Sequence, residues 1–170
     1  MRPSAIEESL LSGEDAETHT VRLAREKARA VARRFPDAWI LGTDTVVVLD
    51  DEILGKPTDE AVARRTLGRL SGREHRVVTG VALVAPGGEV REELYEESRV
   101  RFRKLSADEI AAYVASGEPL DKAGSYGIQG GAADFVARLQ GSYENVVGLP
   151  IDAVREMLRR AGLYPPRVGP

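Results

Sequence analysis

The 170-residue sequence predicts a single domain over residues 1–170, of the α/β or α+β class and built on a mixed β-sheet. Two observations support this prediction. Segments whose apolar residues recur with a helical period alternate along the chain with short β-branched runs. Two of the expected strands are separated only by Pro86-Gly87-Gly88, a short turn that favours an antiparallel pair.

The first regular element is a helix that we expect from about Thr18 to Pro36-Asp37, with Ser12 as a candidate cap. The residues expected on its core face are Val21, Ala24, Ala28, Val31 and Phe35. Those on the opposite, solvent side are Arg22, Arg25, Arg29 and Arg33. Lys27 lies on the border of the apolar stripe, where a lysine often does no more than extend its amine to solvent.

Residues 39–57, WILGTDTVVVLDDEILGKP, contain two apolar runs that predict buried strands. Asp50-Asp51 predicts a hairpin turn after the second run. Asp44 stands between the runs, and a charged group there costs free energy unless it is paired, hydrogen-bonded or bound to a metal. The alternative is a carboxylate that only tightens a turn.

The following segments predict a helix, two strands and a short helix. Thr58 is expected to cap the first helix, which ends at Ser71-Gly72. Strands are expected over 76–85 and 93–103, and a capping box at residues 106–109 opens a helix closed by Gly117. The residues expected to face the core from the first of these helices are Ala63, Leu67 and Leu70.

Residues 117–131, GEPLDKAGSYGIQGG, form a long glycine-rich loop, a kind of segment that is often functional. Its glycines would let backbone N–H groups approach a ligand. A strand over 134–139, a polar turn over 141–145 and a helix with Pro150 in its first turn are expected to follow. The core face of that helix is predicted to be Ile151, Val154, Leu158 and Ala161.

Composition excludes several classes of function. The net charge is −3 with acidic and basic residues interspersed, so duplex nucleic acid is not expected as a partner. The absence of cysteine excludes thiol nucleophiles and thiolate metal sites. His19 and His75 are too few for a multi-histidine site and are expected at the surface. No apolar run is long enough to span a membrane, so we expect a cytoplasmic protein.

The remaining candidates for chemistry are carboxylates and lysines on expected loops: Glu7 or Glu8, Asp44, Lys56, Asp121 and Lys122. Carboxylate oxygens suit a hard cation such as Mg²⁺ or Mn²⁺, and lysines suit phosphate oxygens. These residue types would permit metal-assisted cleavage of a phosphoanhydride by water. They are also the types found on ordinary solvated loops.

Three stretches resemble the Maf family of nucleoside triphosphate pyrophosphatases. Residues 39–83, from WILGTDTVVV to RVVTGVAL, look like its central signature, while YVASGEPLDKAGSYGIQG and GSYENVVGLPI look like its two C-terminal signatures. VRLAREKARAVA is similar to its first long helix. The resemblance covers about Pro3 to Leu163 in order and implies an elongated, strongly twisted mixed sheet flanked by helices, with a cleft between two lobes.

The resemblance implies hydrolysis of a nucleoside triphosphate to the monophosphate and pyrophosphate with a divalent cation, Mg²⁺ or Mn²⁺. Asp44 matches the family residue expected to act as general base or metal ligand. Glu8, with Glu7 adjacent, matches a metal-holding glutamate. Lys27, Lys56 and Gln129 match residues that bind phosphates or orient the nucleotide.

The form DKAGSYGIQG, with Gln129, resembles the branch that acts on dTTP and UTP. Lys122 of this stretch is a further candidate for substrate binding, although Asp121 and Lys122 could serve only to shape the loop. A homodimer would fit the family.

One departure from the family concerns its opening strand, its SxSPRR-type loop and the following helix, for which no counterpart precedes Glu8 in this sequence. Either the sequence is shortened relative to the native product or the protein lacks the element. In the second case the expected function is a catalytically weakened nucleotide-binding or regulatory protein. A third alternative is that the charged residues form no common site.

Overall fold

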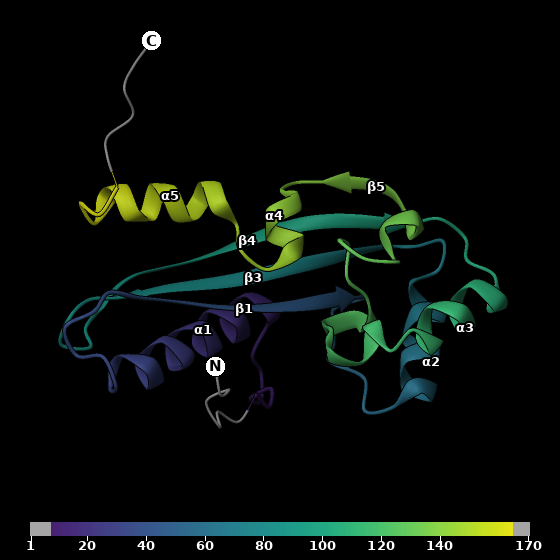
Figure 1. Cartoon of the computed structure of the whole chain (residues 1–170), viewed down its shortest axis with the longest axis horizontal. Helices are drawn as coiled ribbons and strands as arrows, with labels where there is room; N and C mark the ends of the chain where they lie inside the picture. The colour runs from purple at the N-terminus through teal and green to yellow at the C-terminus, as the bar shows by residue number, and fades with distance from the viewer. Residues whose placement is uncertain (1–7, 165–170) are drawn as a thin grey trace, which may run out of the picture. The chain divides into compact units, whose positions relative to one another are not determined.

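The computed structural model describes residues 8–164 (Figure 1). Eleven of its helices, strands and 3₁₀ turns are used in the description below. In chain order they are α1 (Ala16–Ala32), β1 (Ile40–Leu49), β2 (Glu52–Leu54), α2 (Glu60–Leu70), β3 (Glu74–Val84), β4 (Val90–Phe102), α3 (Ala107–Ala115), η1 (Glu118–Asp121), β5 (Val136–Gln140), α4 (Tyr143–Val147) and α5 (Ile151–Arg160). Of two further 3₁₀ turns, Ala123–Ser125 lies within the glycine-rich loop and Ala133–Phe135 follows it.

The five strands form one sheet in the order β2-β1-β3-β4-β5. β2 pairs antiparallel with β1, and β5 with β4. β3 and β4 are joined by a short turn, which is closed by a hydrogen bond from Ala85 N to the carbonyl of Glu89 (2.8 Å). The expected α/β class, with a sheet flanked by helices, is confirmed. The strand pairs at both edges of the sheet are antiparallel, whereas we expected a sheet with both parallel and antiparallel pairs.

The chain divides into two compact units, which agree with the expected lobes. Unit 1 comprises residues 1–44, 79–96 and 148–170, as far as they are described. Unit 2 comprises residues 45–78 and 97–147. The three long strands β1, β3 and β4 contribute residues to both units. The cleft implied by the resemblance stays a prediction.

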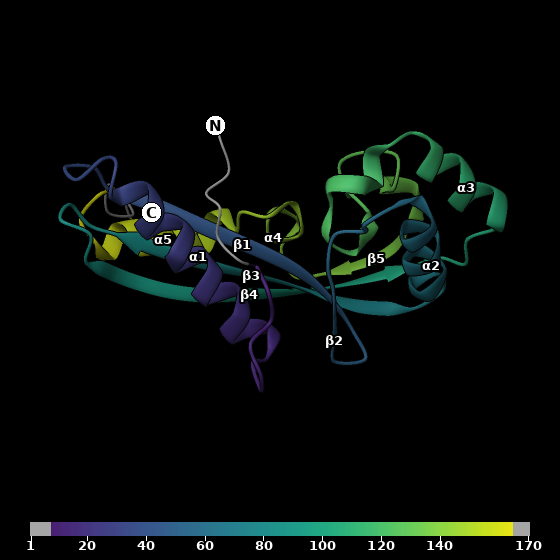
Figure 2. The ribbon, with the colours of Figure 1, turned by 90° about the horizontal axis from the view of Figure 1, so that it is seen from below.

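In unit 1, the alternation of side chains along β3 gives each face of the sheet its own helix. Val84 packs with Ala28 and Ala32 of α1, whereas Val81 and Leu83 pack with α5 residues. Because successive side chains of a strand point to opposite faces, α1 and α5 cover opposite faces of this part of the sheet. Figure 2 shows α1 in front of the strands and α5 behind them.

The contact between α1 and the sheet is unusually close because two strand positions lack a side chain. A Cβ at Gly42 would overlap the backbone of Ala24, and one at Gly80 would overlap the backbone of Thr20. The small α1 residues that face these glycines are fully buried. This close packing sets the height of α1 above β1, and so positions the side chains at the border of the helix.

The core of unit 2 surrounds Phe102, whose ring makes edge-to-face contacts with three other rings. They belong to His75, Tyr126 and Phe135, with centroid distances of 5.0, 4.8 and 5.9 Å. Ala63, Leu67 and Leu70 of α2 are fully buried in the same cluster, as expected. The aromatic contacts connect β3 and β4 with the glycine-rich loop.

Several local predictions are confirmed. Asp50 and Asp51 both have positive φ (51° and 64°) and turn the chain between Leu49 and its partner Glu52. Ser106 and Glu109 form the expected capping box of α3.

Other local predictions are wrong for identifiable reasons. α1 is capped by Asp15, whose carboxylate accepts from Thr18 N, and not by Ser12. It ends at Ala32, so Phe35 lies beyond the helix and is 57% exposed, and Val31 is 36% exposed. Leu23 is buried in their place, because the helix lies on the sheet by its small side chains.

Corrections of the same kind apply to the later helices. Asp59 rather than Thr58 caps α2, accepting a hydrogen bond from Val62 N. The expected polar turn over 141–145 contains the start of a short helix, α4. In α5, Met157 is buried and Ile151 is 38% exposed. Pro150 is the N-cap of this helix and not a residue of its first turn. No helix among residues 8–164 has both the length and the apolar character that a membrane span requires.

Candidate active site

Asp44 lies in the middle of β1, and not on the loop that we expected. It is two residues from Gly42, so both point to the face of the sheet that α1 covers. Its side chain is only 10% exposed. A carboxylate at this depth needs a partner, because transfer of an unpaired charge from water is costly.

The partner is Lys27 of α1. Its ammonium Nζ lies 2.6 Å from Oδ1 of Asp44 and 2.6 Å from Oε1 of Glu8. The lysine side chain is 27% exposed and that of Glu8 is 45% exposed. Lys27 therefore does not simply extend into solvent. One ammonium group holds two carboxylates that come from different parts of the chain.

Burial and pairing act on these groups in opposite directions. Burial raises the pKa of the Asp44 carboxyl above its ordinary value, and the hydrogen bond from Lys27 offsets this only in part. Burial alone would lower the pKa of Lys27, but its hydrogen bonds to Asp44 and Glu8 outweigh burial, so its pKa is raised. Lys27 therefore stays charged, and Asp44 is a stronger proton acceptor than an exposed aspartate.

The two carboxylates fit a divalent cation as far as the described residues allow. Mg²⁺ is usually held by one or two protein carboxylates together with substrate phosphates, and both Mg²⁺ and Mn²⁺ favour oxygen ligands. Glu8 and Asp44, which already share the cationic Lys27, form such a pair. Within residues 8–164 no group of three or more metal-binding side chains is present. Glu7 lies outside the described residues.

His19 is buried, with 4% of its surface exposed, so its predicted surface position is wrong. Its ring contacts Glu14 and Arg22, and a positive charge on it would lower the pKa of Asp44. His75 is also buried, at 2%, in the core of unit 2. The signal for His19 was present in the sequence, because it lies four residues before the buried Leu23 and so shares its face of the helix.

The other candidate residues lie in unit 2. Lys122 Nζ is 2.7 Å from Oδ1 of Asp121. The pKa of Asp121 is lowered, chiefly by the Lys122 hydrogen bond, and the charge of Lys56 adds to the effect. The loop that carries Lys56 is joined to the glycine-rich loop by a hydrogen bond from Gly124 N to the carbonyl of Gly55 (3.2 Å). Lys56 and Lys122 therefore both act on the exposed carboxylate of Asp121.

Gln129 is exposed in a turn of the same loop. The turn is fixed by Glu118, which sequence reasoning did not single out. Its carboxylate accepts hydrogen bonds from the hydroxyl of Tyr113 and from Gly131 N, both at 3.1 Å. A Cβ at position 130 would overlap this carboxylate, so a larger residue there would displace the Glu118 side chain. The signal in the sequence that could have indicated this role was the position of Glu118 at the start of the glycine-rich loop.

Ser125 adds strain to this loop. It is a non-glycine residue with φ of 62°, it is fully buried, and its Oγ has no hydrogen-bond partner among the described residues. Strained backbone and unsatisfied buried hydroxyls each cost free energy and are concentrated at functional sites. The structure thus brings Glu8, Lys27 and Asp44 together in unit 1, and Lys56 and Lys122 together in unit 2, where Gln129 belongs to the same loop as Lys122.

Comparison with known proteins adds independent information. A family model described as "Maf-like protein" matches residues 1–161. A dTTP/UTP pyrophosphatase of Koribacter versatilis is 48% identical over 163 residues, which cover 96% of this chain and 83% of that protein. One of Symbiobacterium thermophilum is 56% identical over 144 residues, covering 85% and 73%. One of Myxococcus xanthus is 52% identical over 158 residues, covering 93% and 79%.

Proposed function

Because the chain belongs to the family of Maf-like proteins, we propose that it is a nucleoside triphosphate pyrophosphatase that acts on dTTP and UTP. The proposed reaction adds water across a phosphoanhydride bond and yields a nucleoside monophosphate and pyrophosphate. The relatives named dTTP/UTP pyrophosphatases support the substrate class. The observation that carries the chemistry is the contact set of Lys27 with Asp44 and Glu8.

In this proposal Asp44 accepts the proton of the attacking water. The water oxygen bonds to phosphorus as the bond from phosphorus to the bridging oxygen breaks, and pyrophosphate leaves. The raised pKa of Asp44 favours proton transfer, because a base works best when its pKa is near the working pH. Lys27 orients this carboxylate through Oδ1 and places a fixed positive charge beside the reacting phosphate.

A divalent cation, Mg²⁺ or Mn²⁺, would be held by Glu8 and Asp44 and would supply charge neutralisation of the phosphates when bound. Lys56 and Lys122 would bind phosphate oxygens as point charges. Gln129 offers both a donor and an acceptor, which suits a pyrimidine edge or a sugar hydroxyl. A homodimer and a cytoplasmic location stay predictions.

The test is pyrophosphate release from a panel of nucleoside triphosphates in the presence of Mg²⁺ or Mn²⁺. We expect release from dTTP and UTP in preference to purine nucleotides. The Asp44→Asn variant, which keeps the size of the side chain and removes its charge, is the control. Calorimetric binding of dTTP with no release above this control would contradict hydrolysis and favour a binding or regulatory role.

A further inference from the structure

Glu8 reaches the candidate active site on a segment that has little hydrophobic anchoring. Residues 8–15 precede α1 and contain no helix or strand. The two large apolar side chains of the segment, Leu10 and Leu11, are each 53% exposed. Because hydrophobic stabilisation scales with the apolar area removed from water, they contribute little to holding the segment in place.

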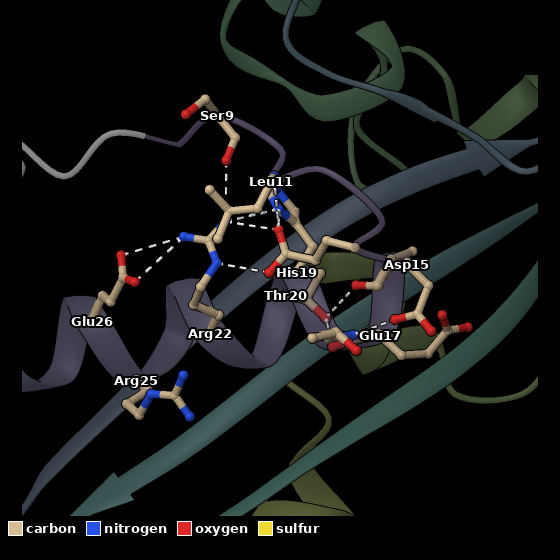
Figure 3. A network of polar contacts seen from close by, with 12 residues as sticks. Ser9, Leu11, Asp15, Glu17, His19, Thr20, Arg22, Arg25 and Glu26 are labelled. Carbon is tan, nitrogen blue, oxygen red and sulfur yellow. Dashed lines mark hydrogen bonds and ion pairs between the residues drawn. The ribbon is translucent and has the colours of Figure 1, made fainter.

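A polar network joins this segment to α1 instead (Figure 3). The guanidinium of Arg22 donates from Nε to Oε1 of Glu14 (2.7 Å) and from Nη2 to Oε2 (2.8 Å). Nη2 also donates to the carbonyl of Ser9, at 3.1 Å. Ser9 directly follows Glu8 in the chain, so this bond fixes the backbone next to the carboxylate-bearing residue.

Glu14 completes the attachment from within the segment. Its Oε2 accepts a hydrogen bond from Leu11 N at 3.2 Å, and Glu14 N donates to the carbonyl of Leu11 at 3.1 Å. His19 Nδ1 lies 3.0 Å from the same Oε2. Nη2 of Arg22 lies 3.3 Å from the same Nδ1, so whether this nitrogen donates or accepts depends on the tautomer of His19. One carboxylate thus binds the segment, the helix and the buried histidine.

The network is buried, which makes it strong. The side chain of Glu14 is 5% exposed and that of Arg22 is 13% exposed. The Arg22 hydrogen bonds are the main reason that the pKa of Glu14 is lowered to about 2, so the carboxyl is ionised under all ordinary conditions. A two-point guanidinium–carboxylate contact is also directional, and breaking a buried pair is far more costly than breaking an exposed one.

We propose that Arg22 and Glu14 are positioning residues that hold the backbone of residues 9–11 so that Glu8 meets Lys27 and Asp44. Their kinetic effect rests on the proposed function, whereas their effect on the segment does not. Loss of either residue is expected to release Glu8 from the site. The cost then falls on cation binding, in which Glu8 takes part, rather than on the reaction at saturating cation.

Arg25 provides a matched control. It lies three residues after Arg22 on α1 and also pairs with a glutamate, but its partner is Glu93 of β4, at 3.2 Å. The two side chains are 33% and 27% exposed. Replacing Arg25 removes the same chemical group from the same helix and leaves the attachment of residues 9–11 intact.

The experiment compares Glu14→Gln, Arg22→Met and Arg22→Lys with Arg25→Met. Two quantities are measured in each: hydrogen exchange at the Leu11 amide, and the Mn²⁺ concentration that gives half-maximal pyrophosphate release. Glu14→Gln and Arg22→Met are expected to speed exchange and to raise the Mn²⁺ requirement about tenfold, the lower range for residues that orient a metal ligand. The turnover number at saturating Mn²⁺ should stay near that of the parent protein.

Arg22→Lys retains the charge without the two-point contact. Its Leu11 exchange and its Mn²⁺ requirement should therefore lie between those of the parent protein and those of Arg22→Met. Arg22→Lys also replaces Arg22→Met if that variant fails to fold. The proposal is overturned if Glu14→Gln and Arg22→Met, or Arg22→Lys where Arg22→Met does not fold, match Arg25→Met in both Leu11 exchange and Mn²⁺ requirement. If the parent protein releases no pyrophosphate, the exchange comparison and calorimetric Mn²⁺ binding still decide the positioning role, so the two proposals fail separately.

Discussion

Each of the two units contains an aspartate paired with a lysine, but the two aspartates differ in exposure and in the direction of their pKa shift. Asp44 is 10% exposed, on a strand, and paired with a lysine of a helix. Asp121 is 76% exposed, ends the short 3₁₀ turn η1 within the glycine-rich loop, and is paired with the next residue, Lys122. Burial raises the pKa of Asp44, whereas the lysine contact lowers that of Asp121. The strand and the helix packed on it hold Asp44 away from water, whereas the surface loop leaves Asp121 in contact with water.

The difference separates two tasks. A proton acceptor gains from partial burial and a fixed geometry, which a strand and a packed helix supply. Recognition of a flexible triphosphate needs charges that are reachable from solvent, which loops supply. We therefore propose that the unit 1 group serves the chemical step and that the unit 2 group serves substrate binding. Matched substitutions in the two groups test this division.

Of the two lysine substitutions, Lys27→Met is expected to have the larger effect. It removes the ammonium shared by Asp44 and Glu8. We expect the turnover number to fall about 100-fold, the scale of losing one charge-stabilising group. The free energy of unfolding should fall by about 2 kcal/mol, less than for a fully buried pair because the Lys27 side chain is 27% exposed. Steady-state kinetics and urea unfolding measure the two effects, and an unchanged turnover number would contradict the assignment.

A second prediction concerns stability at acid pH, which depends on a histidine buried in the core of unit 2 rather than on the exposed charged groups. Burial lowers the pKa of His75 from 6.5 to about 4. The folded state therefore binds fewer protons than the unfolded state between these values, and stability falls as the pH is lowered through them. We expect a loss of about 2 kcal/mol between pH 7 and pH 5 from this residue. His75→Gln, which can still bond the hydroxyl of Tyr126, should remove that part of the pH dependence.

Urea unfolding at the two pH values provides the measurement. Carboxyl groups also titrate below pH 5, so the comparison with His75→Gln isolates the histidine. An equal loss of stability in the parent protein and in the variant would show that His75 is not buried in its neutral form.

Lys122→Met should have a smaller effect of a different kind than Lys27→Met. The lysine side chain is 42% exposed, so its removal should leave the free energy of unfolding unchanged. We expect KM for dTTP to rise about tenfold with little change in turnover number, because substrate and transition state lose the same contact. A larger fall in turnover number than in Lys27→Met would reverse the division between the two groups.

The smallest expected effect is that of Ser125→Gly. Glycine removes the strain of a φ of 62° together with a buried, unsatisfied hydroxyl. We expect the free energy of unfolding to rise by about 1 kcal/mol and activity on dTTP to decrease. Ser116→Gly, at a φ of −69°, should instead lower stability. Destabilisation by Ser125→Gly would show that the loop is not strained at this residue.

Much of the fold could be predicted from the sequence because it depends on local chemistry. Asp50-Asp51 turns the chain as its residue types require, and Ser106 with Glu109 caps α3. The burial of Ala63 and Leu67 follows from their helical period. Val31 and Phe35 were assigned to the core incorrectly, because only the packing of α1 on Gly42 and Gly80 decides which apolar residues are covered.

The site was predictable in part, and for different reasons at different residues. Asp44 stood out as a carboxylate between apolar runs, although its place inside one strand did not. The expectation that Glu8 and Lys27 belong to one site came from family resemblance, and their contact was not predicted, since no periodicity relates a loop residue to a helix 19 positions away. Glu14 and Arg22 were missed because a buried ion network has the composition of an ordinary solvated surface.

The most direct test of the account compares Asp44→Asn with Asp121→Asn in pyrophosphate release from dTTP at saturating Mn²⁺. The two substitutions are chemically identical and differ only in the unit that carries them. The account predicts that Asp44→Asn lowers the turnover number by about 10²–10⁴-fold, the contribution of a general base, and that Asp121→Asn changes it less than about tenfold. Equal effects of the two substitutions, or a larger effect at Asp121, would contradict it.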